Sequence, residues 1–200
     1  LLGAVAGGFA THFLGAQASL VCVAALALGI SLKDSAAVLA KVPHVQGRVE
    51  VVPTPGKDYT ILIDYAHTPD SMVNVLRTVK EFAKGRTVAV FGCGGDRDRE
   101  KRPQMGRIVS RLADVAVVTS DNPRWEQPEK IIEDILPGLT GPAESVVICD
   151  RREAIGWALK NSRPGDVIAL CGKGHETYQE VCGEKRHMDE RELVAAYTNG

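Results

Sequence analysis

Five short apolar runs recur along the chain, and the segments between them have the spacing of amphipathic helices. The runs cover residues 60–63, 87–91, 115–119, 145–149 and 167–171, and the helical segments cover residues 69–83, 101–112, 127–136, 151–161 and 190–198. Continuous apolar runs of this length are typical of parallel strands that are buried on both faces. The alternation predicts an α/β domain with a mostly parallel sheet and flanking helices. A hairpin is expected within residues 178–188, at one edge of the sheet.

Each apolar run is followed by a loop that carries glycine, charged residues or histidine. The loops cover residues 64–70, 92–98, 121–124, 150–152 and 172–176. In open α/β sheets, ligands bind beyond the carboxyl ends of the parallel strands, so a small-molecule site is expected at this edge. The loop Asp121-Asn122-Pro123-Arg124 offers a carboxylate, an amide and a guanidinium, which together can hold a zwitterion. The alternative for this loop is a strand-to-helix turn in which Arg124 pairs with a nearby acid.

Charge and composition narrow the class of protein. The chain has 24 Lys plus Arg against 25 Asp plus Glu, and 5% aromatic residues, which argues against nucleic-acid binding. Its five cysteines are odd in number and lack a C-x-x-C pair, which favours reduced, buried thiols in a cytoplasmic protein over disulfides or a structural zinc site. The 200 residues are enough for one domain and part of another.

The first segment contains an uncharged, mostly apolar run at residues 13–30, which is long enough to span a membrane. Gln17 interrupts the run and no basic residues flank it, so a buried helix of a non-membrane protein is favoured. A second short helix is expected at residues 31–39, with Ser31 as its cap. We place a domain boundary between residues 46 and 47. Because the chain opens on Leu1-Leu2, we expect a piece of a longer protein.

Simple nucleotide-binding motifs are incomplete. The sequence has no G-x-x-x-x-G-K-[ST] loop, and the G-x-G-x-x-G pattern that begins at Gly92 has Arg97 where the third glycine belongs. An ordinary Rossmann-type nucleotide domain is therefore a weak alternative, since Asp114, the acid at the required distance, begins a strand. Lys173, between Gly172 and Gly174, could meet a phosphate or only shape its loop.

The loop motifs, taken together, resemble a known family. The runs D-Y-A-H-T-P-D, F-G-C-G-G-D-R-D, K-R-P-x-M-G, S-D-N-P-R and G-K-G-H-E occur in the order found in the Mur ligases, and the resemblance extends over residues 47–197. It is strongest to the members that add meso-diaminopimelate to UDP-N-acetylmuramoyl-L-alanyl-D-glutamate. The resemblance implies a Rossmann-like C-terminal domain at residues 47–200, preceded at residues 1–46 by a helical remnant of the central ATPase domain.

The resemblance also implies a reaction. In this family ATP and Mg²⁺ convert a carboxylate to an acyl phosphate, and the amine of the incoming amino acid then displaces phosphate. The parent protein is expected to be cytoplasmic, to act in peptidoglycan synthesis, and to bind the UDP-N-acetylmuramoyl dipeptide through domains that this sequence lacks. The chain alone is therefore expected to be inactive, with no residue performing the chemical step. A noncatalytic amino-acid-binding module derived from such a ligase is the alternative.

By resemblance, seven residues form the diaminopimelate site. Arg97 would hold one carboxylate and Arg124 the distal carboxylate, while the distal centre is surrounded by Asp121, Asn122, Pro123, Gly172 and Glu176. Lysine lacks the distal carboxylate and would leave Arg124 unpaired, so the site should favour diaminopimelate.

Three further residues match the family's nucleotide contacts and hinge. Asp64 and His67 match the loop that reaches ATP, and Arg48 matches the hinge residue. The alternative for His67 is a turn histidine that caps the helix beginning at Pro69. One departure lies at Leu14 and Gln17, where the family has asparagines near the nucleotide.

Overall fold

The computed structural model describes residues 23–39 and 45–198, in two compact units, Leu1–Val45 and Gln46–Gly200. In the first unit, residues 23–27 are helical and helix α2 covers Leu32–Leu39. The Ser31 hydroxyl accepts a hydrogen bond from the Asp34 N–H at 3.1 Å, which confirms Ser31 as the cap. Within the described residues no helix has the length and apolar character needed to cross a membrane.

The apolar run at residues 13–30 falls mostly outside the described residues, and so do Leu14 and Gln17. In its described end, Val23 and Leu26 are exposed, so the expected burial is not found there.

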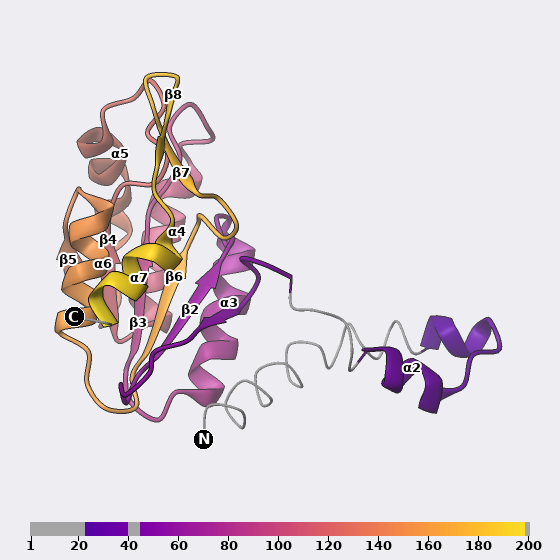
Figure 1. Cartoon of the computed structure of the whole chain (residues 1–200). Helices are drawn as coiled ribbons and strands as arrows, with labels where there is room; N and C mark the ends of the chain where they lie inside the picture. Colours follow the sequence, from indigo (N-terminus) through magenta and orange to yellow (C-terminus); the bar gives the residue numbers. More distant parts are fainter. Residues whose placement is uncertain (1–22, 40–44, 199–200) are drawn as a thin grey trace. The chain divides into compact units, whose positions relative to one another are not determined.

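The second unit is built on a six-stranded sheet (Figure 1). Its strands are β1 (Glu50–Val52), β2 (Thr60–Asp64), β3 (Thr87–Phe91), β4 (Val115–Val118), β5 (Glu144–Val147) and β6 (Val167–Cys171), in the spatial order β1-β2-β6-β3-β4-β5. Every pairing is parallel except that of β1 with β2, which confirms the expected mostly parallel sheet. Ile63, Leu170, Val90 and Val117 form one row across the four central strands, so the loops that follow these strands lie side by side.

Helices cover both faces of the sheet (Figure 1). They are α3 (Pro69–Phe82), α4 (Lys101–Leu112), α5 (Pro128–Ile135), α6 (Arg151–Lys160) and α7 (Glu190–Thr198), with a short 3₁₀ turn at Leu136–Gly138. Ile155 of α6 and Val194 of α7 pack with alternate residues of the strands, such as Ile63, to form the core of one face. All five helices lie within one or two residues of their expected bounds, because apolar periodicity and Pro or Asp at the first turn mark them clearly.

Two expectations need correction. Strand β5 lies at the sheet edge with Val147 exposed, so the fourth apolar run, at residues 145–149, is not a strand buried on both faces. The hairpin, β7 (Tyr178–Val181) and β8 (Glu184–His187), is a separate two-stranded sheet and does not extend an edge of the main one (Figure 1). It contacts the loop after β4 instead: the Arg124 N–H donates to Glu180 O at 3.0 Å, and the Cys182 N–H donates to Arg124 O at 2.7 Å.

The cysteines that the structure describes, Cys93, Cys149, Cys171 and Cys182, are free thiols. Cys93 and Cys171 are buried, and burial raises the pKa of the Cys93 thiol to about 12. Cys182 is exposed on the hairpin, so the expectation of buried thiols does not hold for it.

Candidate functional site

The loops after β3 and β4 are joined by backbone contacts. The Gly95 N–H donates to Asn122 O at 2.9 Å. A side chain at Gly95 would collide with the carbonyl of Pro123, so this approach requires glycine. The sequence Gly92-Cys93-Gly94-Gly95 therefore lets the backbone approach another loop of this chain closely.

The side chains of the two arginines of the predicted site both approach Gly94. A Cβ atom built on Gly94 would be 2.8 Å from Arg124 Nη1 and 3.8 Å from Arg97 Cγ. Arg97 is exposed and donates to its neighbouring carbonyl, Asp96 O, at 2.9 Å. The structure thus brings the side chains of two arginines close to one glycine, and guanidinium groups are the usual partners of carboxylates.

Arg124 is held in an uncommon conformation. Its φ of 52° lies in the left-handed region, which costs free energy for a residue with a side chain. The contacts of its backbone with Glu180 and Cys182 hold it there, while its Nη1 donates to Gly95 O at 2.8 Å. Its Nε also lies 3.3 Å from Glu180 Oε2, so the pairing with a nearby acid, considered above as an alternative, is present.

A buried polar network joins Asn122 to the loop after β6. Lys173 Nζ donates to Asn122 Oδ1 at 2.7 Å and to Glu176 Oε2 at 2.9 Å. Asn122 Nδ2 donates to the same Glu176 oxygen at 2.9 Å. Lys173 is fully buried, so its role here is to orient Asn122 and Glu176, and not to meet a phosphate.

Asp121 and Gly172 face each other across the site. Asp121 is buried, and its Oδ1 accepts the Asn122 N–H at 2.6 Å. A side chain at Gly172, whose φ is +115°, would collide with Asp121 Oδ2. The seven residues of the predicted amino-acid site, Pro123 included, all lie in the loops after β3, β4 and β6. These loops come together, as the sequence predicts for the ends of parallel strands.

Arg48, Asp64 and His67 form a second group around Tyr65. The Arg48 guanidinium lies 4.8 Å from the centre of the Tyr65 ring, and the His67 ring packs edge-on against it at 4.7 Å. Asp64 is buried and accepts the N–H groups of Val49 and Ala66, both at 2.7 Å. Burial raises the pKa of Asp64 above its ordinary value in spite of these hydrogen bonds.

Two alternatives from the sequence are not supported. Thr68, not His67, caps α3, through a reciprocal capping box with Ser71. Asp114 accepts the Thr87 N–H at 2.8 Å where β3 begins, at the end of the strands opposite the site loops. It therefore cannot serve as the acid of a Rossmann-type cofactor site.

A further network, which sequence reasoning did not identify, supports the loop of Arg97. The buried Arg102 pairs with Glu126 at 2.7 Å and with Asp134 at 2.8 Å. Glu126 Oε1 also accepts the Asp96 N–H at 2.7 Å. The hydrogen bond from Arg102 lowers the pKa of Glu126 to about 2. Arg102 lies three and seven residues before Met105 and Val109, so its spacing places it on the buried face of α4, although its charge suggests an exposed side chain.

A protein-family model matches most of the second unit. Residues 47–174, which contain all but one of the predicted site residues, match the model for the Mur ligase glutamate ligase domain. The chain belongs to the Mur ligase family. The resemblance found in the motifs is thus confirmed.

Curated Mur ligases share about half of their residues with the matching part of this chain. The protein of Trichormus variabilis named UDP-N-acetylmuramoyl-L-alanyl-D-glutamate--2,6-diaminopimelate ligase is 51% identical over 174 residues, which are 86% of this chain and 35% of that protein. The Clostridium botulinum protein of the same name is 47% identical over 172 residues, again 86% of this chain and 35% of that protein. This chain therefore spans about a third of the length of these Mur ligases.

Solved Mur ligases have the same fold. A structure titled UDP-N-acetylmuramoyl-L-alanyl-D-glutamate--2,6-diaminopimelate ligase matches with a TM-score of 0.72 and 38% identity, over 89% of this chain and 36% of that one. The MurF ligase of Thermotoga maritima in complex with ADP matches with a TM-score of 0.57 and 17% identity, over 88% of this chain and 35% of that one. The second likeness concerns the fold alone.

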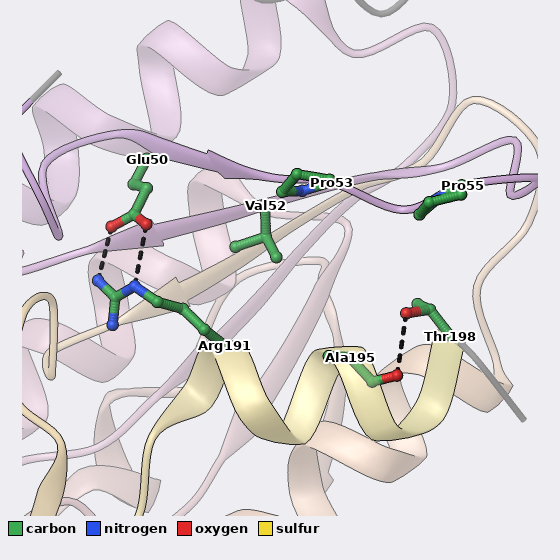
Figure 2. Close-up of a pocket in the computed structure, with 7 residues that line it drawn as sticks. All are labelled: Glu50, Val52, Pro53, Pro55, Arg191, Ala195 and Thr198. Atoms are coloured by element: carbon green, nitrogen blue, oxygen red, sulfur yellow. Dashed lines mark hydrogen bonds and ion pairs between the residues drawn. The ribbon is translucent and has the colours of Figure 1, made fainter. Parts of the chain in front are cut away.

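The described part of this Mur ligase chain offers no group of three or more His, Cys, Asp or Glu side chains that could hold a metal ion. An open groove of about 370 Å³ lies between β1 and α7, and Figure 2 shows Glu50 and Arg191 paired at one end of it. None of the predicted site residues lines this groove.

Proposed function

We propose that residues 47–200 are the amino-acid-binding domain of a cytoplasmic, ATP-dependent ligase, and that residues 1–46 are the end of its central ATPase domain. The ligase would add meso-diaminopimelate to UDP-N-acetylmuramoyl-L-alanyl-D-glutamate in peptidoglycan synthesis, as the names of the relatives suggest. ATP and Mg²⁺ would be its cofactors, bound mainly by other parts of the protein.

The observation that carries the proposal is that the side chains of Arg97 and Arg124 both approach Gly94, beside the network of Asn122, Lys173 and Glu176. Diaminopimelate has two carboxylates and two amines. One carboxylate pairs with Arg97, and the distal carboxylate pairs with Arg124. Asp121 and Glu176 then receive the distal ammonium. A site that offers Arg124 to the distal carboxylate and two carboxylates to the distal ammonium matches the zwitterionic distal end of diaminopimelate. Such a site discriminates against a substrate that lacks either charge.

The free amine of the held substrate must reach the activated carboxylate. ATP first transfers its terminal phosphoryl group to the carboxylate of the dipeptide, forming an acyl phosphate. The uncharged amine attacks the acyl carbon, the amide bond forms, and phosphate leaves as the amine loses its proton. This domain contributes by holding the amine near the acyl carbon, which raises its effective concentration.

The group of residues around Tyr65 would contribute to nucleotide binding. Arg48 and His67 are exposed beside Tyr65, where they can meet a nucleotide when the domains close. Asp64 fixes the start of this loop to the backbone of Val49 and so supports closure.

The test uses the full-length protein with ATP, Mg²⁺ and the UDP-linked dipeptide. We expect phosphate release and a new amide product by mass spectrometry with meso-diaminopimelate, and much less with lysine. Preference for lysine would overturn the assigned substrate. Binding of diaminopimelate without phosphate release would instead support the noncatalytic binding module.

A further inference from the structure

Arg151, the first residue of α6, is fully buried and carries a charge. Its Nη2 lies 2.7 Å from Glu190 Oε1, and both side chains are at most 1% exposed. Glu190 Oε2 is also buried and has no hydrogen-bond partner among the described residues. A buried ion pair of this kind costs much of its attraction in lost hydration, so stability alone is a poor reason for it.

The remaining hydrogen bonds of Arg151 point to a different role. Nη2 donates to Cys171 O at 2.9 Å, and Nη1 donates to Ser120 O at 3.4 Å. These carbonyls immediately precede Gly172 and Asp121, the two residues that face each other in the site. Strands β4 and β6 are not neighbours, because β3 lies between them. Arg151 therefore joins two loops that the hydrogen bonds of the sheet do not join.

Arg191, which follows Glu190 in α7, holds the loop after β6 at its other end. Arg191 Nη2 donates to Gly174 O at 3.1 Å, and Arg191 also pairs with Glu50 at 2.6 Å (Figure 2). The first turn of α7 thus supports the loop 172–174 from both sides, directly through Arg191 and through Arg151 by way of Glu190.

We propose that Arg151, fixed by Glu190, is a positioning residue that sets the separation between Asp121 and Gly172 and so the width of the amino-acid site. The inference rests on the proposed function, because it assumes that these two loops hold diaminopimelate. Arg151 is placed behind the loops and has no contact with the substrate. Arg151 should therefore affect the binding of diaminopimelate, and not that of ATP or of the UDP-linked dipeptide.

The decisive variant is Arg151→Lys in the full-length enzyme. Lysine keeps the positive charge beside Glu190, but a single ammonium cannot replace the guanidinium fork that reaches two carbonyls. We expect the KM for diaminopimelate to rise about 10- to 100-fold, since small displacements of substrate-holding groups have effects of this size. The KM values for ATP and for the UDP-linked dipeptide should stay within about twofold.

Arg86→Lys is the matched control. Arg86 also pairs with a buried carboxylate, Asp166, at 2.7 Å, but it lies where β3 begins, at the end of the strands opposite the site loops. The control should lower the melting temperature and leave the KM for diaminopimelate unchanged. If Arg151→Lys only lowers the melting temperature, or raises all three KM values alike, Arg151 is only structural and the proposal is overturned.

Glu190→Gln keeps the test decisive if Arg151→Lys does not fold. It preserves the shape of the side chain but removes the charge that fixes Arg151, and it should raise the KM for diaminopimelate selectively; an unchanged KM would overturn the proposal. If the unmodified full-length enzyme shows no reaction with diaminopimelate, the proposed function itself fails. Activity of the unmodified enzyme together with unchanged variants overturns only the role of Arg151.

Discussion

The Arg124 guanidinium pairs with the carboxylate of Glu180, with Nε 3.3 Å from Oε2. Arg124 lies in the loop after β4 and Glu180 lies in the separate hairpin, so the pair joins two elements that are distant in sequence. Glu180 therefore occupies the guanidinium that we assign to the distal carboxylate of the substrate. All kinetic measurements on the variants use the full-length enzyme.

Arg124→Ala should cut the use of diaminopimelate sharply. Removing one partner of a largely desolvated charge pair costs about 2 to 5 kcal/mol. Lysine lacks the distal carboxylate and should lose much less, so selectivity falls together with rate. Arg124→Lys should restore little, because an ammonium cannot reproduce the two-pronged hydrogen bonding. The measurement is kcat/KM for both amino acids; equal losses on both would show that Arg124 is structural.

Glu180→Gln should bind diaminopimelate more tightly. The substitution removes a carboxylate that competes for Arg124, and a partly exposed pair of this kind contributes up to about 1 kcal/mol. We expect the KM for diaminopimelate to fall by a factor of about two to five, with the KM for ATP unchanged. A higher KM would instead assign Glu180 to the ammonium of the substrate.

Gly172→Ala should raise the KM for diaminopimelate. The added methyl group would collide with Asp121 Oδ2, and the φ of +115° is unfavourable for alanine. Gly56→Ala is the matched control, because Gly56 also has a positive φ, +72°, but a Cβ there meets no atom within 4 Å. Both variants should lose some stability, and only Gly172→Ala should lose substrate affinity. Similar kinetics in the two variants would show that the close approach of Gly172 to Asp121 does not matter for substrate binding.

Asp64→Ala should raise the KM for ATP several-fold more than the KM for diaminopimelate. Asp64 holds the N–H groups of Val49 and Ala66, and with them the segment that carries Arg48 and the loop that carries His67. Losing it leaves two backbone donors without this partner and loosens the nucleotide side of the domain. Steady-state kinetics with each substrate varied in turn measures the difference. The opposite order of effects would move this loop to the amino-acid site.

The pair of Arg102 and Glu126 should give a defined dependence of stability on pH. Arg102 lowers the pKa of Glu126 from 4.5 to about 2, so the ionised carboxylate favours the folded state. This contribution is complete above about pH 4.5 and is lost as the pH falls toward 2. In thermal unfolding of this chain, the difference in stability between the unmodified protein and Glu126→Gln should therefore shrink over that range.

Glu133→Gln serves as the control for this titration. Glu133 pairs with Lys130 at 2.7 Å, but both side chains are more than half exposed, so little stability should depend on them. A difference for Glu126→Gln that persists unchanged down to pH 2 would contradict the lowered pKa.

Much of the fold follows from local pattern. Buried parallel strands need continuous apolar runs, and the loops at their carboxyl ends need residues that suit turns and ligands, so both are visible along the chain. That is why Asp121, Arg124 and Gly172 could be singled out before their distances were known. The strand exposed at one edge was missed, because an apolar run such as residues 145–149 has the same appearance whether one or both faces are covered.

The tertiary structure alone decided which loops meet. Strand β6 lies between β2 and β3, and this order brings Lys173 and Glu176 to Asn122 across about fifty residues of sequence. It also decided that Arg151 is buried behind the site and that Glu180 faces Arg124. Residue type and spacing describe neighbours along a strand or helix, but a charge pair between distant segments depends on how the strands are ordered and the hairpin is placed. The sequence by itself determined the chemistry available at the strand ends, and packing determined its geometry.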